Sequence, residues 1–149
     1  MKKKLKSYKT TSVNWGNSQV DITKLLNSNG IQDVRFSFIR SMHTIICEFN
    51  YPDVVNGKEI PIGTRIMWPC QSDDEKVVNQ MHRALFYYLK SKFEANTCEA
   101  MEFKREFFAH LVVFDKNGNS KTMYDMIGPQ YEQGLLSGEQ GDIKLLPSL

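Results

Sequence analysis

Every second residue is apolar along three successive runs between residues 33 and 68, as Val34 and Phe36 illustrate in the first run. Strict alternation is typical of a β-strand with one buried face. Between the second and third runs stands Asn56-Gly57, the dipeptide that two-residue hairpin turns prefer. We therefore predict a three-stranded antiparallel meander over roughly 33–39, 42–51 and 58–68.

The segments before and after this meander have apolar residues at helical spacing. Ser18 and Asp21 have the spacing of a capping box, which predicts a short helix that ends at Gly30, after an extended segment over 10–17. Ser72 and the acidic residues after it predict the start of a long helix. One face of this helix is apolar: Val78, Met81, Leu85, Tyr88 and Leu89. We expect that face to cover one side of the meander.

The C-terminal third predicts further, shorter helices. A helix is expected from about residue 98, with Phe103, Phe107 and Leu111 as its apolar stripe, and LVVF either ends it or forms a strand. Thr122 and Asp125 form a second capping box, so residues 123–136 should be helical with an interruption at Gly128-Pro129. The predicted fold class is α+β: a three-stranded antiparallel meander packed against one long helix, with additional shorter helices.

Charge is distributed unevenly along the 149 residues. Residues 1–9 contain five lysines and no acidic residue, which predicts a flexible basic tail ahead of a single domain over 10–149. The whole chain has a net charge of +2, but residues 10–149 contain 14 basic against 17 acidic residues. The net charge of residues 10–149 therefore does not indicate a surface that binds nucleic acid. The tail is either a solubilising terminus or an arm that binds phosphates.

The sequence lacks the motifs of the common catalytic and phosphate-binding classes. GxSxG, Walker A and GxGxxG are absent, and Cys47 lies in an apolar strand that should keep its thiol protonated. Cys70, His82, Cys98 and His110 are too scattered for a zinc knuckle. Glu102, Glu106 and His110 form a helical row that fits a cation, although a solvated edge with His110 paired to Glu106 is more typical. We expect a non-enzymatic protein with no metal and no cofactor.

Aromatic and basic residues together offer the best candidate surface. Arg83, Tyr87 and Lys90 share one face of the long helix, and the spacing of the two cations suits neighbouring phosphates. The alternative is a solvated face, which Glu94 on the same side favours. Lys92 lies within the apolar stripe and must extend to solvent, pair or face a cleft. The candidate nucleic-acid or partner-binding residues are Arg83, Tyr87, Lys90, Lys92, Lys2, Lys3 and Lys4.

The first predicted strand offers a second stacking surface. Phe36 and Phe38, with Arg35 and Arg40 nearby, have the composition of a platform for single-stranded nucleic acid. Phenylalanines at every second position of a small sheet more often face the core, and we favour that interpretation.

Five segments of the chain carry a resemblance to a known group of proteins. They are KLLNSNGI, RALFYYLKSKFEA, FKREFFAHLVV, GNSKTMYDMIGPQYEQG and the closing KLLP. In their order these segments resemble a family of short uncharacterised proteins encoded by bacteriophages. The resemblance implies an accessory role inside the host cell, and it names no reaction and no catalytic residue. The lysine-rich terminus departs from the family pattern.

Three functions agree with these observations. The first is a phage accessory protein that contacts nucleic acid or a replication or recombination complex, and the second is a protein-binding inhibitor or anti-defence factor. The third, a sponge for a small nucleotide signal, requires a pocket lined by Lys92 and aromatic residues. No apolar run in the sequence is long enough to cross a bilayer, and no apolar segment follows the first lysines. We expect a cytoplasmic protein with no membrane partner.

Overall fold

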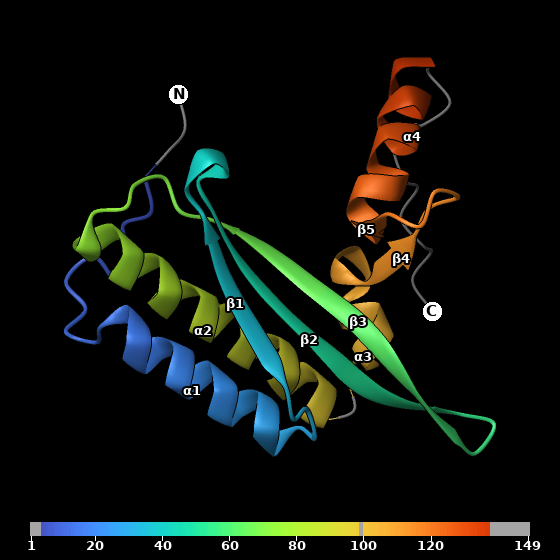
Figure 1. Cartoon of the computed structure of the whole chain (residues 1–149), viewed down its shortest axis with the longest axis horizontal. Coiled ribbons are helices and arrows are strands. Elements are labelled where there is room, and N and C mark those ends of the chain that lie inside the picture. The colour runs from blue at the N-terminus through green and yellow to red at the C-terminus, as the bar shows by residue number, and fades with distance from the viewer. Residues whose placement is uncertain (1–3, 99, 138–149) are drawn as a thin grey trace, which may run out of the picture.

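The computed structural model describes residues 4–98 and 100–137 (Figure 1). Its elements in chain order are α1 (Trp15–Ser28), β1 (Val34–Ile39), η1 (Arg40–Met42), β2 (Thr44–Val55), β3 (Lys58–Pro69), α2 (Glu75–Thr97), α3 (Phe103–Glu106), η2 (Phe108–His110), β4 (Val112–Phe114), β5 (Ser120–Thr122) and α4 (Met123–Ser137). Strands β1, β2 and β3 form one antiparallel sheet in that order. The predicted α+β class, with its meander and its one long helix, is confirmed.

A two-residue turn joins β2 to β3, as Asn56-Gly57 predicts. Val55 pairs with Lys58, and the two residues between them have φ angles of 53° and 77°. Positive φ at both central positions is the geometry of a type I′ turn, which matches the twist of the strands it joins. The turn fixes the register of a hairpin whose tip extends beyond the helices (Figure 1).

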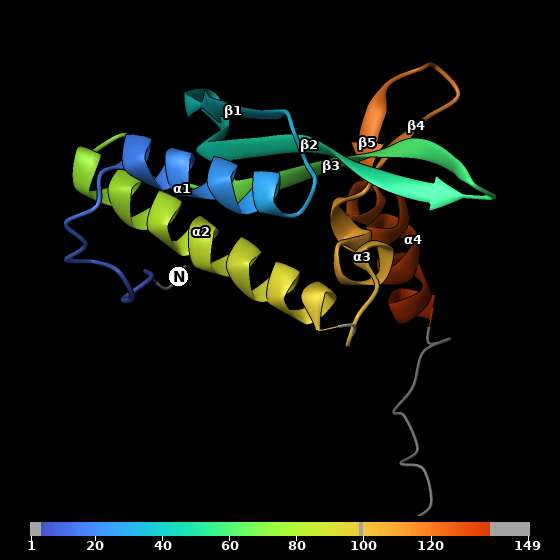
Figure 2. The ribbon, with the colours of Figure 1, turned by 90° about the horizontal axis from the view of Figure 1, so that it is seen from below.

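Helices α1 and α2 lie side by side against one face of the sheet (Figure 2). Alternate strand residues face them, so Phe36, Cys47 and Ile66 occupy neighbouring positions across the three strands. Leu85 and Leu89 of α2 are fully buried in the same core. The apolar face predicted for the long helix therefore covers the sheet, and Phe36 and Phe38 pack against the core rather than forming a platform.

Aromatic rings fill the end of the core near α3. The ring of Phe107 lies 4.5 Å from that of Phe103 and 5.1 Å from that of Phe93, and Phe49 of β2 completes the cluster at 6.2 Å from Phe107. These distances suit offset and edge-to-face contacts, which add to the burial of apolar surface. The aromatic cluster joins the sheet, α2 and the segment that follows α2.

The first helix begins earlier than the capping box predicted. Asn14 is its N-cap, and the side-chain oxygen of Asn14 accepts a hydrogen bond from the Asn17 amide at 2.8 Å. Residues 15–17 are therefore helical rather than extended, and Ser18 is a buried position inside α1. The prediction was wrong because two plausible caps lie four residues apart, and burial of the Ser18 side of the helix decided between them.

Two expectations for the C-terminal third were also wrong. The helix expected from about residue 98 is reduced to the short α3 and η2, whereas the strand alternative for LVVF is confirmed by β4, and Leu111 forms a bridge with Thr64 of β3. The expected interruption at Pro129 does not occur, because Pro129 lies inside α4. Asp125 and Pro129 are exposed, so water can satisfy the Asp125 carbonyl that proline leaves without a donor. The predicted Thr122 cap is confirmed by a 3.2 Å bond from the Asp125 amide.

The β4–β5 hairpin approaches the sheet along β3. A Cβ atom on Gly63 would lie 3.4 Å from the Cβ of Val112, which is tight, so glycine allows this approach. Helix α4 follows β5 directly and lies beyond β3, away from α1 (Figure 1). Its surface is therefore mostly exposed in the described part of the chain.

Candidate nucleic-acid interface

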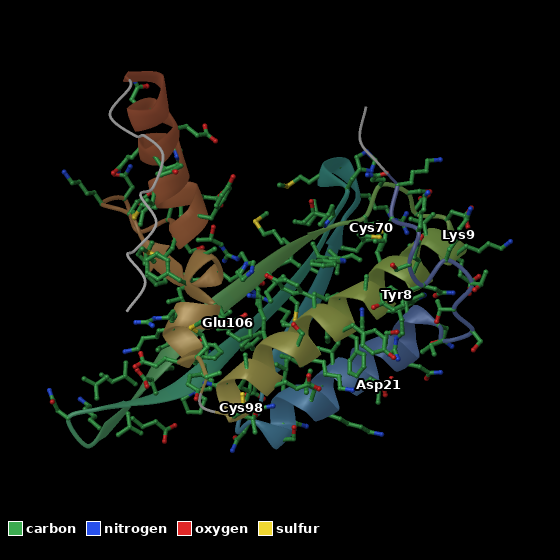
Figure 3. The ribbon with its side chains drawn as sticks, turned by 180° about the vertical axis from the view of Figure 1, so that it is seen from behind. Tyr8, Lys9, Asp21, Cys70, Cys98 and Glu106 are labelled. Atoms are coloured by element: carbon green, nitrogen blue, oxygen red, sulfur yellow. The ribbon has the colours of Figure 1, made fainter. Side chains whose placement is uncertain are left out.

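The N-terminal segment, where Figure 3 labels Tyr8 and Lys9, contacts α2 at two points. The amide nitrogen of Gln80 donates to the carbonyl oxygens of Leu5 and Ser7, at 2.7 and 2.8 Å. The ring of Tyr8 stacks on that of Tyr87, with centroids 5.1 Å apart and planes inclined by 8°. Residues 5–8 are thus attached to α2, which the expectation of a flexible tail did not anticipate. Lys2 and Lys3 lie outside the described residues.

Lysines surround this contact, and they form what we name the tail–α2 surface. Lys4, Lys6 and Lys9 are exposed, as is Lys90, whose ammonium lies 5.9 Å from the centre of the Tyr87 ring. The surface comprises Lys4, Lys6, Tyr8, Lys9, Tyr87 and Lys90. The first acidic residue of the chain is Asp21, so the tail contributes only positive charge. The structure therefore brings Tyr87 and Lys90 of the predicted site together, and Lys4 is an exposed neighbour of Leu5, which Gln80 binds.

Arg83 does not belong to this exposed surface, contrary to the expectation that it projects into solvent. Its side chain is only 10% exposed and donates to a carboxylate oxygen of Asp21 on α1 at 2.8 Å. Its guanidinium also lies 4.5 Å from the centre of the Phe86 ring. Arg83 joins α1 to α2, and its charge is largely neutralised there.

Lys92 is also paired inside the protein. Its ammonium donates to the backbone oxygen of Glu106 at 2.9 Å and to the carboxylate of Glu106 at 3.1 Å. It lies 4.9 Å from the centre of the Tyr88 ring, and the Lys92 side chain is 15% exposed. Of the three alternatives for Lys92, the structure shows pairing. The nucleotide-sponge hypothesis thereby loses the ligand contact on which it depended.

Replacing Lys92 with methionine should lower the free energy of unfolding by about 1–3 kcal/mol, because it leaves the partly buried oxygens of Glu106 without their donor. The matched control is Lys90→Met. The Lys90 side chain is 48% exposed and its ammonium lies 4.0 Å from the Glu94 carboxylate. Loss of an exposed pair of this kind should change the unfolding free energy by about 0.5 kcal/mol or less. Urea denaturation of both variants measures the difference, and equal midpoints would contradict the assigned role of Lys92.

Burial favours the neutral form of two histidines, the buried His82 and the half-buried His110. Burial lowers the pKa of His82, and its Nδ1 lies 2.8 Å from the carbonyl oxygen of Val78. Burial also lowers the pKa of His110, and the positive charge of Lys92 lowers it further. The Nε2 atom of His110 lies 2.6 Å from the Tyr88 hydroxyl, so His110 pairs with Tyr88 rather than with Glu106 as expected.

Acidification should destabilise the protein as the pH falls below the ordinary histidine pKa of 6.5. There the unfolded chain takes up protons that the folded chain does not, because both folded pKa values are lowered. Unfolding free energies measured from about pH 8 to about pH 5 should therefore decrease through this window, and His110→Phe should reduce the decrease. A variant of the exposed His43, His43→Asn, is the control. A free energy independent of pH in this window would show that folding does not lower the pKa values of these histidines.

The cysteines and acidic residues form no evident reactive group among the described residues. Burial, with a smaller contribution from Glu48, raises the pKa of Cys47 to about 12, so its thiol stays protonated. Glu102, Glu106 and His110 do not share a helix, because the row is divided between α3 and η2. Within residues 4–98 and 100–137, no group of three or more His, Cys, Asp or Glu side chains could hold a metal ion.

The outer face of the sheet contains a groove that the sequence did not indicate. It has a volume of about 820 Å³ and lies between the strands and the β4–β5 hairpin. Glu48 accepts hydrogen bonds from Arg35 and Arg65, at 2.9 and 3.0 Å. Burial alone would raise the pKa of Glu48, but these two arginines hold it below its usual range. The arginines are matched by Glu48 and by Asp33, so the groove offers little net positive charge for an anion.

Comparison with known proteins adds no relative: no family model, no curated protein and no solved structure matches this chain. The resemblance to bacteriophage proteins therefore remains an expectation from the sequence. Among the described helices, none combines the length and apolar character needed to cross a membrane.

Proposed function

We propose that this protein is a non-enzymatic accessory protein that binds nucleic acid, alone or within a replication or recombination complex, through the tail–α2 surface. One observation carries the proposal: the lysine-rich segment is attached to α2 beside exposed tyrosines instead of extending away from the body. Phosphate contacts supply most of the affinity of nonspecific nucleic-acid binding, and lysines provide them. The phage context and the cytoplasmic location belong to the same proposal.

Attachment of the tail to α2 should increase the affinity of this surface for nucleic acid. A free arm loses conformational freedom when it binds, whereas a segment already held by Gln80 and Tyr87 loses less. The body has more acidic than basic residues, so the protein as a whole is not a polycation. Binding should therefore be local, and Glu94 beside Lys90 marks one edge of the surface.

The salt dependence of binding tests this function. Fluorescence anisotropy with labelled oligonucleotides, between about 50 and about 200 mM salt, should give a logarithmic slope near −0.7 per phosphate contact for single strands and −0.9 for duplex. Replacing Lys4, Lys6 and Lys9 with glutamine should flatten the slope by up to about 2–3. A slope that does not change would remove the tail from the interface. Absence of binding by the native chain would refute the proposal.

A second candidate function, a protein-binding inhibitor, is favoured by a different surface. Tyr124, Ile127 and Tyr131 share one face of α4, and all three side chains are exposed. Exposed apolar side chains in a row are typical of protein interfaces. Capture from infected cells with and without nuclease separates the two functions. An association that survives nuclease and is lost in the Tyr124→Ala/Tyr131→Ala variant would favour this candidate.

A further inference from the structure

The two tyrosines of the tail–α2 surface form a stacking platform that is both exposed and held in place. Tyr8 is 38% exposed and Tyr87 is 41% exposed, although each covers part of the other. Tyr8 lies in a turn with a φ angle of 61°, and the Thr11 amide donates to its carbonyl oxygen at 3.1 Å. Its ring is therefore positioned by the turn on one side and by Tyr87 on the other.

Exposed lysines accompany the tyrosine pair on both the tail and α2. Lys9 follows Tyr8 in the chain and Lys6 precedes it by two residues, and all three are exposed. Lys90 lies close to the ring of Tyr87 on α2. Proteins that bind single strands combine stacking side chains with a basic path for the backbone. The tail–α2 surface has both stacking side chains and lysines, contributed by the tail and by α2.

A duplex fits this surface poorly. Its bases are stacked on one another and cannot reach a tyrosine platform, whereas the bases of a single strand can. Exposed Asp73, Asp74 and Glu75 stand at the start of α2. From there to Tyr87 the distance along the helix axis is about 20 Å. A rigid duplex aligned with α2 would pass these carboxylates and be repelled, but a flexible strand can follow the tail and avoid them.

We propose that the tail–α2 surface is specific for single-stranded nucleic acid, with unpaired bases stacked on the Tyr8–Tyr87 pair and phosphates beside Lys6, Lys9 and Lys90. This inference rests on the proposed function and adds the class of ligand. It assigns Tyr87 a contact with the base, in addition to its contact with the tail.

Three probes separate stacking from charge: a strand of about 20 thymidines, an abasic strand of the same length and a duplex of the same length. The native protein should bind the thymidine strand at least about tenfold more tightly than either other probe. Tyr87→Leu should weaken thymidine binding about tenfold and abasic binding much less, because Gln80 still holds the tail. Tyr87→Phe should retain thymidine binding. Tyr124→Leu, which removes an exposed tyrosine from α4, is the matched control.

The outcomes distinguish single-strand specificity from the proposed nucleic-acid binding on which it rests. Equal affinity for all three probes, with loss of binding when Lys4, Lys6 and Lys9 become glutamine, would overturn strand specificity and leave nucleic-acid binding intact. Binding to none of the probes would overturn both. The comparison of thymidine and abasic strands uses the native chain, so it decides the question even where a Tyr87 variant fails to fold.

Discussion

Replacing Phe107 with alanine should lower the free energy of unfolding by about 3–5 kcal/mol. Phe107 is fully buried, and its ring contacts those of Phe103, Phe93 and Phe49. Truncation would leave a cavity where the sheet, α2 and the following segment meet, and rigid aromatic neighbours would fill it only in part. Chemical denaturation followed by tryptophan fluorescence measures the loss.

The next residue in the chain is the control. Phe108 is 51% exposed, whereas Phe107 is fully buried. Phe108→Ala should therefore change the free energy of unfolding by about 0.5 kcal/mol or less. The two variants remove the same side chain from adjacent positions and differ only in burial. Similar losses for both variants would show that the segment after α2 is packed differently from the arrangement described above.

Reversing the charges of Lys4, Lys6 and Lys9 to glutamate should weaken nucleic-acid binding at least about a hundredfold at modest salt. Three attractions become three repulsions next to the Tyr8–Tyr87 pair. These side chains are exposed, so thermal stability should change little. Anisotropy with a labelled single strand, together with a thermal melt of the same sample, measures both effects.

A control variant with the same change in net charge tests for a general electrostatic effect. Arg40, Lys58 and Lys116 are exposed and lie in η1, at the start of β3 and in the β4–β5 turn, outside the tail–α2 surface. Their triple change to glutamate should leave binding within a few-fold of the native affinity. Equal weakening by the two triple variants would contradict a localised binding surface.

The sheet and the long helix were predictable because their signals are local. Alternation over 33–68 and the Asn56-Gly57 turn determine strand register within a short stretch of sequence. The 3.6-residue period places Leu85 and Leu89 on the buried face of α2 for the same reason. The weaker predictions concerned the segment after α2, where Leu111 pairs with Thr64 of β3, which is far away in the sequence.

The candidate site was harder to predict, because the exposure of each side chain depends on neighbours that are far away in the sequence. Periodicity placed Arg83 opposite the apolar stripe, but it cannot show that α1 lies there with Asp21 as a partner. Lys92 was recognised as a residue that needs a partner, and only the fold shows that the partner is Glu106. The attachment of the tail depends on Gln80, a residue with no distinctive sequence signal.

The central claim is that nucleic acid binds at the tail–α2 surface, and mapping of photochemical crosslinks tests it most directly. A single strand that carries 5-bromouracil would be irradiated with the native protein, and the crosslinked peptides identified by mass spectrometry. Because halogenated bases react with aromatic rings in contact with them, the crosslinks should fall on Tyr8 or Tyr87. Crosslinks confined to Phe114 in the outer groove or to Tyr124 and Tyr131 of α4 would contradict the claim.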